Sequence, residues 1–191
     1  MKKGSLFIIT GTSAVGKTTV ANLVLKKIKN LQRSLTYTTR PLRAKEKDGK
    51  DYHFISKEEF KKKIKKSDFL EWANNYGNLY GTAKREITNL LKKGKNVLIN
   101  VDIKGALNIK KKWPNCITIF ILPESIKQLA SRFKKRHDTS PAQVQKRLQI
   151  AQWELAKAPQ CDYWVINREN KIKQTVKETL EIINSKTLTK S

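Results

Sequence analysis

The chain has 191 residues and carries 41 basic against 16 acidic side chains, a formal net charge of +25. This length predicts one or at most two compact domains with a real core, and two widely separated cysteines predict neither a disulfide framework nor a metal site. No apolar run approaches the ~18 residues that span a bilayer, and the N-terminus has no signal-like core, so a cytoplasmic protein with no membrane partner is expected.

The first predicted elements surround a phosphate-binding motif. The apolar run at 6–9 predicts a strand over 5–10, and the helical spacing of apolar residues after residue 19 predicts a helix over about 17–30. Between them the chain fits G-x-x-x-x-G-K-[ST], and strand, loop and helix are the context that this motif needs. The expected ATP-binding loop comprises Gly11, Thr12, Ser13, Ala14, Val15, Gly16, Lys17, Thr18 and Thr19.

The loop suits a phosphate chain for simple physical reasons. Glycine at the tight bends lets backbone N–H groups point inward, and the following helix offers free N–H groups and the positive end of its dipole. Lys17 can reach the terminal phosphates. The hydroxyl of Thr18 can bind a Mg²⁺ that bridges phosphate oxygens.

From residue 34 the pattern becomes polar and turn-rich. Ser56 and Glu59 have the spacing of a capping box. The expected elements of this stretch are short antiparallel strands within 34–54, a helix over about 57–66, a strand over 69–73 and a turn with a short strand within 75–81. The stretch of about 34–82 is therefore read as a β-rich insert.

After residue 82, helices and strands alternate, which predicts an α/β fold with a largely parallel sheet. The expected helices lie at about 83–93, 103–112, 124–136, 141–157 and 170–184, and the expected strands at 96–101, 116–122 and 162–166. The helical stretch of about 126–155 interrupts the alternation a second time. An α/β nucleotide core with two inserts is typical of a small-molecule kinase, where closure of one insert over the donor phosphates excludes water.

A second motif follows the phosphate loop. It consists of Thr38-Thr39-Arg40-Pro41-Leu42-Arg43 and then Glu46, Gly49, Asp51, Tyr52 and Phe54. Together the two motifs resemble the guanylate kinase family, and the resemblance continues over nearly the whole chain. The further matching segments are Glu71-Trp72-Ala73, Gly77-Asn78-Leu79-Tyr80-Gly81-Thr82, Val101-Asp102-Ile103-Lys104-Gly105, the lid residues Arg132, Arg136 and Lys146-Arg147-Leu148, and Val165-Ile166-Asn167.

The resemblance implies a P-loop nucleoside monophosphate kinase: one domain with a three-layer α/β core and parallel sheet at about 1–33, 83–125 and 156–191, a GMP-binding insert at about 34–82 and a helical lid at about 126–155. It implies the reaction ATP + GMP ⇌ ADP + GDP with Mg²⁺. The implied GMP-binding residues are Thr36, Arg40, Arg43, Tyr52, Glu71, Tyr80, Thr82 and Asp102. The implied catalytic residues are Lys17, Arg40, Arg132, Arg136 and Arg147, with Asn167 on the adenine side and the metal held by Thr18 and, through water, by Asp102.

The acceptor residues also make chemical sense without the resemblance. Arg40 and Arg43 can fork onto a phosphate dianion, and the phenol of Tyr52 can donate a further hydrogen bond. Guanine presents two donors on one edge, from which the carboxylate of Glu71 can accept, whereas adenine presents an acceptor there. Asp102 follows a buried strand, where α/β sheets bind ligands, and it is equally placed to cap the next helix.

The chain departs from the family pattern at a few positions. Ala14 replaces a glycine of the phosphate loop, where a methyl group restricts positive φ. Thr36 replaces a serine near the base and keeps the hydroxyl, Asn100 stands where an acidic residue is common, and Lys104 replaces a glutamine.

Two other functions are weighed against the kinase. A guanylate-kinase-like protein-binding module that has lost catalysis typically lacks the phosphate loop, which is intact here, and a kinase of another small phosphorylated acceptor would not need Glu71. The charge alone invites a nucleic-acid partner, but only eight of the 41 basic residues are arginines, and spread lysine is mostly solvated surface, so none is expected. The sequence leaves open whether the protein is a monomer or a dimer and whether dGMP is accepted.

Overall fold

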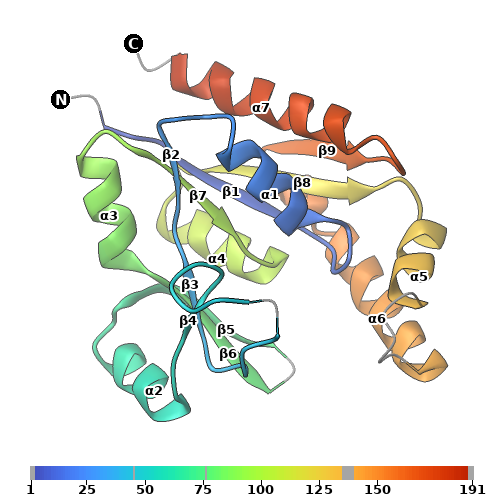
Figure 1. The fold of residues 1–191 in the computed structure, drawn as a ribbon, viewed down its shortest axis with the longest axis horizontal. Helices are drawn as coiled ribbons and strands as arrows, with labels where there is room; N and C mark the ends of the chain where they lie inside the picture. The colour runs from blue at the N-terminus through green and yellow to red at the C-terminus, as the bar shows by residue number, and fades with distance from the viewer. Residues whose placement is uncertain (1–2, 45, 76, 135–139, 189–191) are drawn as a thin grey trace.

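The computed structural model describes residues 3–44, 46–75, 77–134 and 140–188, and a parallel sheet runs through its centre (Figure 1). Its five strands are β1 (Leu6–Gly11), β2 (Leu31–Arg33), β7 (Asn96–Asn100), β8 (Ile117–Pro123) and β9 (Tyr163–Asn167), in the order β2-β7-β1-β8-β9. All neighbouring pairs are parallel. Every residue of β1 is buried, so the central strand reads as a continuous apolar run.

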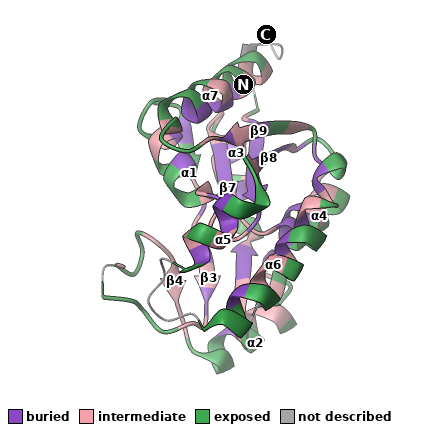
Figure 2. Ribbon diagram, turned by 90° about the vertical axis from the view of Figure 1, so that its right-hand side faces the viewer, coloured by how far each residue is buried: buried purple, intermediate pink, exposed green. Residues whose placement is uncertain are grey.

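Helices cover both faces of this sheet and complete the predicted three-layer α/β core (Figure 2). Side chains alternate along β1, so Phe7 and Ile9 pack with helices α1 and α7, while Leu6 and Ile8 pack with α3 and α4. These helices are α1 (Lys17–Leu25), α7 (Ile172–Leu188), α3 (Lys84–Lys92) and α4 (Ile103–Lys112).

A second, smaller sheet lies at the lower end of the molecule in Figure 1. Its strands β3 (Thr36–Thr38), β4 (His53–Phe54), β5 (Phe69–Asn75) and β6 (Asn78–Ala83) have the order β4-β3-β6-β5. Helix α2 (Lys57–Lys65) starts at the predicted capping box of Ser56 and Glu59. Its fully buried Phe60 packs on Phe69, with ring centroids 4.5 Å apart. This sheet therefore has a small aromatic core of its own.

Two helices, α5 (Ile126–Lys134) and α6 (Pro141–Leu155), lie between β8 and β9 in the chain, followed by a short 3₁₀ turn, η1 (Ala158–Gln160). Serine and glutamine at 140 and 143 form a capping box for α6. Leu129 and Phe133 of α5 and Val144 and Ala151 of α6 are buried in the same cluster as α1 and α7. The two helices are thus packed against the core along one side.

Three expectations need correction. The first helix ends at Leu25 rather than near 30, because residues 31–33 form a strand, β2, that was not predicted. This strand is stabilised by parallel pairing with β7 and by the burial of Leu31. Strand β4 pairs with β3 in parallel, not antiparallel, because the long loop between them brings residue 53 back beside Tyr37 in the same direction. The last helix, α7, extends to Leu188 rather than ending near 184, and the remaining elements lie within three residues of their expected bounds. In the described part of the chain, no helix combines the length and apolarity that crossing a membrane would require.

Candidate functional site

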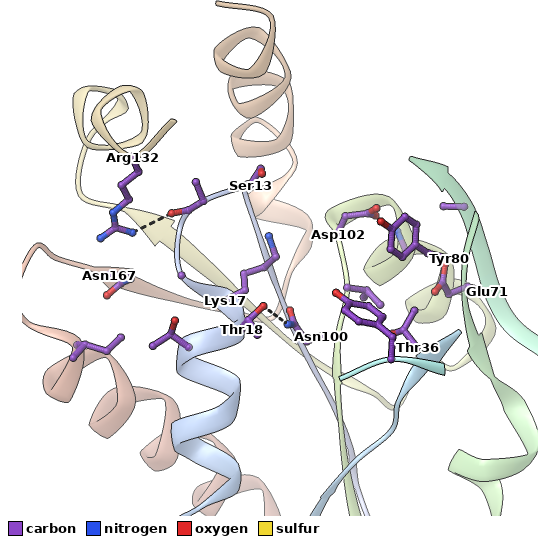
Figure 3. A pocket seen from close by; sticks show the side chains of 18 of the residues that line it. Ser13, Lys17, Thr18, Thr36, Glu71, Tyr80, Asn100, Asp102, Arg132 and Asn167 are labelled. Atoms are coloured by element: carbon purple, nitrogen blue, oxygen red, sulfur yellow. Dashed lines mark hydrogen bonds between the residues drawn. The ribbon is translucent and has the colours of Figure 1, made fainter. Parts of the chain in front are cut away.

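A cavity of about 750 Å³ opens where the central parallel strands end. It is lined by the phosphate loop and α1 (Ser13, Ala14, Gly16, Lys17, Thr18, Thr19), by the smaller sheet and its loops (Thr36, Tyr52, Glu71, Ala73, Tyr80), by the region after β7 (Asn100, Val101, Asp102, Gly105), and by Arg132, Asn167, Arg168, Asn170 and Ile172. Figure 3 shows Lys17 and Thr18 on one side of this space and Glu71, Tyr80 and Thr36 on the other. Several separate parts of the chain therefore line one cavity.

A second cavity of about 800 Å³ adjoins the first and shares four of its lining residues. The shared residues are Ser13, Lys17, Tyr80 and Asp102. Residues that line only the second cavity include Arg43, Lys104, Arg147, Trp153 and Glu154. The cations among them give this part of the cleft a positive potential, which attracts phosphate groups.

The phosphate loop has the backbone geometry that its glycines allow. Gly16, the N-cap of α1, has a φ of 102°, and a Cβ there would lie 2.7 Å from Nδ2 of Asn167. Ala14 also has a positive φ, 62°. A non-glycine residue in the left-handed region costs roughly 1–2 kcal/mol, so the surrounding contacts must hold the loop in this shape.

The contacts that hold the loop include hydrogen bonds to its carbonyl oxygens. Nη1 of Arg132 donates to the carbonyl oxygens of Ala14 and Val15 at 3.2 and 2.9 Å, and Nδ2 of Asn167 donates to that of Val15 at 2.7 Å. In a trans peptide the C=O and the next N–H point in opposite directions. Carbonyls held in this way turn the following amides to the opposite side, and the amide of Val15 there meets the carbonyl oxygen of Thr12 at 3.4 Å, within the loop.

Lys17 and Thr18 begin α1 beside the loop. Nζ of Lys17 donates to the carbonyl oxygens of Gly11 and Thr12, each at 2.8 Å. The Thr18 hydroxyl accepts from Nδ2 of Asn100 at 3.1 Å. The Oδ1 atom of Asn100 is buried and has no hydrogen-bond partner among the described residues. Hydroxyl and amide oxygens here are hard donors of the kind that Mg²⁺ prefers.

Asp102 caps the N-terminus of α4, as the sequence allowed, and it also lines the cleft. Its Oδ1 accepts the N–H of Gly105 at 2.8 Å, which makes it the N-cap of α4. It lines both cavities as well. In the described part of the chain, no three His, Cys, Asp or Glu residues gather in a way that could hold a metal ion, so a metal here would depend on hydroxyl, amide, water and substrate oxygens.

A buried carboxylate lies across the cavity from the loop. Glu71 of β5 is only 4% exposed, and a register shift between β5 and β6 lets it be buried next to Leu70 while Trp72 is exposed. The hydroxyl of Thr82, directly opposite on β6, donates to Oε1 of Glu71 at 2.9 Å. Burial, with a smaller contribution from the charge of Asp102, raises the pKa of Glu71 to about 7. This carboxyl group is therefore poised between its two charge states near neutral pH.

Two phenols and a threonine complete this side of the cavity. Tyr52 and Tyr80 lie edge to face with ring centroids 6.3 Å apart, and Thr36 is buried on β3. Burial raises the pKa of Tyr52, so its phenol stays protonated and remains a hydrogen-bond donor at neutral pH. The side wall thus offers neutral donors around the carboxylate of Glu71.

The arginines predicted for the acceptor differ in their surroundings. Nη2 of Arg40 pairs with both carboxylate oxygens of Glu46 at 2.8 and 2.9 Å, and its guanidinium lies over the ring of Tyr52 at 5.5 Å. Arg40 does not line either cavity described here, whereas Arg43 lines the second. Among the predicted lid arginines, Arg132 holds the loop and Arg147 lines the second cavity. Arg136 lies outside the described residues.

Sequence reasoning missed one buried acid near the loop. Glu154 of α6 is 9% exposed, and its Oε2 accepts the N–H of Ser13 at 3.3 Å. A signal was available, because Val144, Ala151 and Glu154 fall on one helical face, and a glutamate on an apolar face is unusual. It also missed Arg168 and Asn170, which line the first cavity after β9.

Comparisons with known proteins agree with one another. A family model described as guanylate kinase matches residues 3–186. Guanylate kinases from Thermotoga maritima and Thermus thermophilus are 42% and 38% identical to this chain over 183 residues, covering 96% of it and 87% and 82% of the relatives. The crystal structure of guanylate kinase from Anaplasma phagocytophilum is similar with a TM-score of 0.79 and 26% identity, covering 97% of this chain and 87% of that one.

Proposed function

The chain belongs to the guanylate kinase family, and on that premise we propose that its joined cavities transfer the γ-phosphoryl group of ATP to GMP, giving ADP and GDP. The activity is that of an ATP:GMP phosphotransferase, with ATP as co-substrate. The observation that carries the proposal is the pairing of a phosphate loop with a buried carboxylate across one cavity of about 750 Å³.

On the donor side, we assign the ATP phosphates to residues 11–19. The loop amides and the N-terminus of α1 bind the phosphate oxygens, and Lys17 extends to the terminal phosphates. Asn167 and Arg132 act behind the loop through their hydrogen bonds to its carbonyls. The adenine ring belongs beside Asn167, next to the cavity wall formed by Arg168 and Asn170.

The residues at Thr18 fit a Mg²⁺ ion. The unpartnered Oδ1 of Asn100 and the Thr18 hydroxyl are oxygen donors beside the loop, and Asp102 lies close enough to the cleft to act through a water molecule. Mg²⁺ held by these oxygens would neutralise part of the charge of the phosphate groups. Asn100 orients the Thr18 hydroxyl: its amide nitrogen donates to the hydroxyl oxygen, so the hydroxyl proton points away from Asn100.

On the acceptor side, we assign the guanine edge to Glu71, with Thr36 and Thr82 as the neighbouring hydroxyls. The GMP phosphate is held by Tyr52, Tyr80, Arg43 and Arg40. A guanidinium has five N–H donors, so Arg40 can bind phosphate and still keep its pair with Glu46.

Catalysis in this arrangement is positioning and charge neutralisation without a covalent intermediate. The developing charge on the transferred group is met by Lys17 and by lid arginines, of which Arg147 lines the second cavity; the same role is proposed for Arg136. We divide the single domain into a core (about 1–33, 83–125 and 156–191), a GMP-binding insert (about 34–82) and a lid (about 126–155). Closure of the lid would exclude water from the donor.

A substrate panel tests this function. Release of ADP from ATP is measured with GMP, dGMP, AMP, CMP and UMP as acceptors, each with and without Mg²⁺. We expect turnover with GMP that depends on Mg²⁺ and is at least ~10³-fold more efficient than with AMP, because a carboxylate built for two donors rejects an acceptor edge. Equal use of GMP and AMP would contradict the proposal.

The raised pKa of Glu71 predicts a pH dependence of GMP binding. Guanine binds the ionised carboxylate, and below pH 7 the unliganded protein holds a proton there that must first be lost. We therefore expect the affinity for GMP to rise by about tenfold between pH 6 and pH 8. Calorimetric titrations over this range measure it. The same series with Glu71→Gln separates out the ionisation of the GMP phosphate, and an equally steep rise in that variant would exclude Glu71 as the cause.

Gly105 predicts a steric effect on the same carboxylate. A Cβ at this position of α4 would lie 3.1 Å from Oε2 of Glu71, so Gly105→Ala must displace the carboxylate by a few tenths of an ångström. We expect kcat/KM for GMP to fall about tenfold while KM for ATP is unchanged. Alanine is the better helix former, so thermal unfolding should show no loss of stability. Equal losses for both substrates would argue against the assignment.

A further inference from the structure

The carboxylate of Glu154 occupies an unusual position in this molecule. It belongs to the last turn of α6, it is 9% exposed, and it lines the second cavity. Its Oε2 accepts the N–H of Ser13, so it joins two segments that lie 141 residues apart in the chain. Ser13 is one of the loop residues labelled in Figure 3.

A buried acid is not expected beside a phosphate-binding loop. A loop that binds phosphates favours anions, so a fixed carboxylate beside it competes with the ligand, and its burial costs free energy unless it is paired. An apolar side chain would have filled the same face of α6, next to Val144 and Ala151. Two features set Glu154 apart from such a side chain: the nearby positive charges of Lys17 and Lys104, and the hydrogen bond that it accepts from the amide of Ser13.

That hydrogen bond adds to the restraints on the strained part of the loop. Arg132 and Asn167 hold the carbonyls of Ala14 and Val15, and Glu154 holds the amide of Ser13. Ala14, between these contacts, has a φ of 62° without being glycine. A residue in the left-handed region keeps that conformation only when its surroundings over-determine it.

We propose that Glu154 is a positioning residue for ATP: by accepting the N–H of Ser13 it fixes the phosphate loop in its binding shape and ties the loop to the end of α6. The same helix carries Arg147 two turns earlier, ~10 Å along its axis, where it lines the same cavity as Ser13. This inference rests on the proposed function. Glu154 acts through the loop and has no contact with the reacting atoms.

Three variants test the proposal. Glu154→Ala removes the acceptor, and Glu154→Gln keeps an acceptor oxygen without the charge. Glu181→Ala on α7 is the control, because it removes an exposed carboxylate that is paired with Lys177 and raises the net charge equally. We expect KM for ATP to rise about tenfold in Glu154→Ala, with KM for GMP changed less than twofold. Glu154→Gln should remain within about threefold of the parent for both substrates.

Hydrogen exchange gives a readout that does not depend on turnover. In Glu154→Ala the amides of residues 13–15 should exchange at least about fivefold faster, while those of the central strand β1 before Gly11 stay as in the parent. If the alanine variant does not fold, Glu154→Asp, which is one methylene shorter and too short to keep this hydrogen bond, serves the same comparison.

The outcomes are distinct. An unchanged or lower KM for ATP in Glu154→Ala, an equal rise for GMP, or a glutamine variant as impaired as the alanine variant would each overturn the proposal. These results presuppose a parent protein that phosphorylates GMP. A parent with no such activity would instead overturn the proposed function, while the exchange experiment would still decide the role of Glu154 in the loop.

Discussion

Replacing Lys17 by alanine should lower kcat for phosphoryl transfer by on the order of 10³-fold or more. Nζ of Lys17 is the flexible cation at the head of α1, and in the structure it donates to the carbonyl oxygens of Gly11 and Thr12. The substitution removes a full positive charge where the charge on the transferred group develops. Steady-state kinetics with saturating ATP and GMP measure the loss.

Lys27→Ala is the matched control for this experiment. Lys27 is exposed just after the same helix, so its removal lowers the net charge equally without touching the loop. We expect its kcat to remain within twofold of the parent, and the unfolding temperature of Lys17→Ala to stay close to that of the parent. Turnover by Lys17→Ala at the parent rate would remove the donor assignment.

Replacing Glu71 by glutamine should lower kcat/KM for GMP by about 10³- to 10⁴-fold and leave KM for ATP within about twofold. The amide presents a donor where guanine also donates, and Thr82, which donates to Oε1 of Glu71, loses a charged acceptor. The effect on GMP is large because the site is buried, so water cannot replace the missing partner.

Glu58→Gln is the control for Glu71, because Glu58 lies exposed on α2 beside the same sheet. We expect its kinetic constants to match those of the parent. A Glu71→Gln variant that still preferred GMP over AMP by the parent's ratio would show that another group reads the base.

Much of the fold follows from local rules that the sequence displays. The strand, loop and helix around Lys17, the capping box at Ser56 and the alternation of apolar strands and helices depend on short-range chemistry, and the structure has each of them.

The features that could not be predicted depend on partners distant in the chain. Strand β2 is only three residues long, and it forms because its backbone can pair with β7. The parallel direction of β4 depends on the path of the long loop that precedes it. The same holds for individual contacts. Asn100 orients Thr18, and Glu154 holds Ser13, across separations of 82 and 141 residues that no local pattern encodes.

The departures from the family pattern have physical consequences that the structure makes visible. Ala14 adopts the positive φ that its methyl group disfavours, so the loop depends on the hydrogen bonds around it more than a glycine loop would. Lys104, which replaces a glutamine, lies with its ammonium 5.0 Å from the ring centroid of Trp153, joining the start of α4 to the end of α6.

The most direct measurement is a crystal structure of the protein with GMP and a non-hydrolysable ATP analogue bound together. We expect the analogue's phosphates in the loop of residues 11–19 and the guanine N1–H and N2–H₂ within hydrogen-bond distance of the Glu71 carboxylate, on opposite sides of the cavity seen in Figure 3. A complex in which either nucleotide bound elsewhere, or in which Glu71 pointed away from the base, would contradict this expectation.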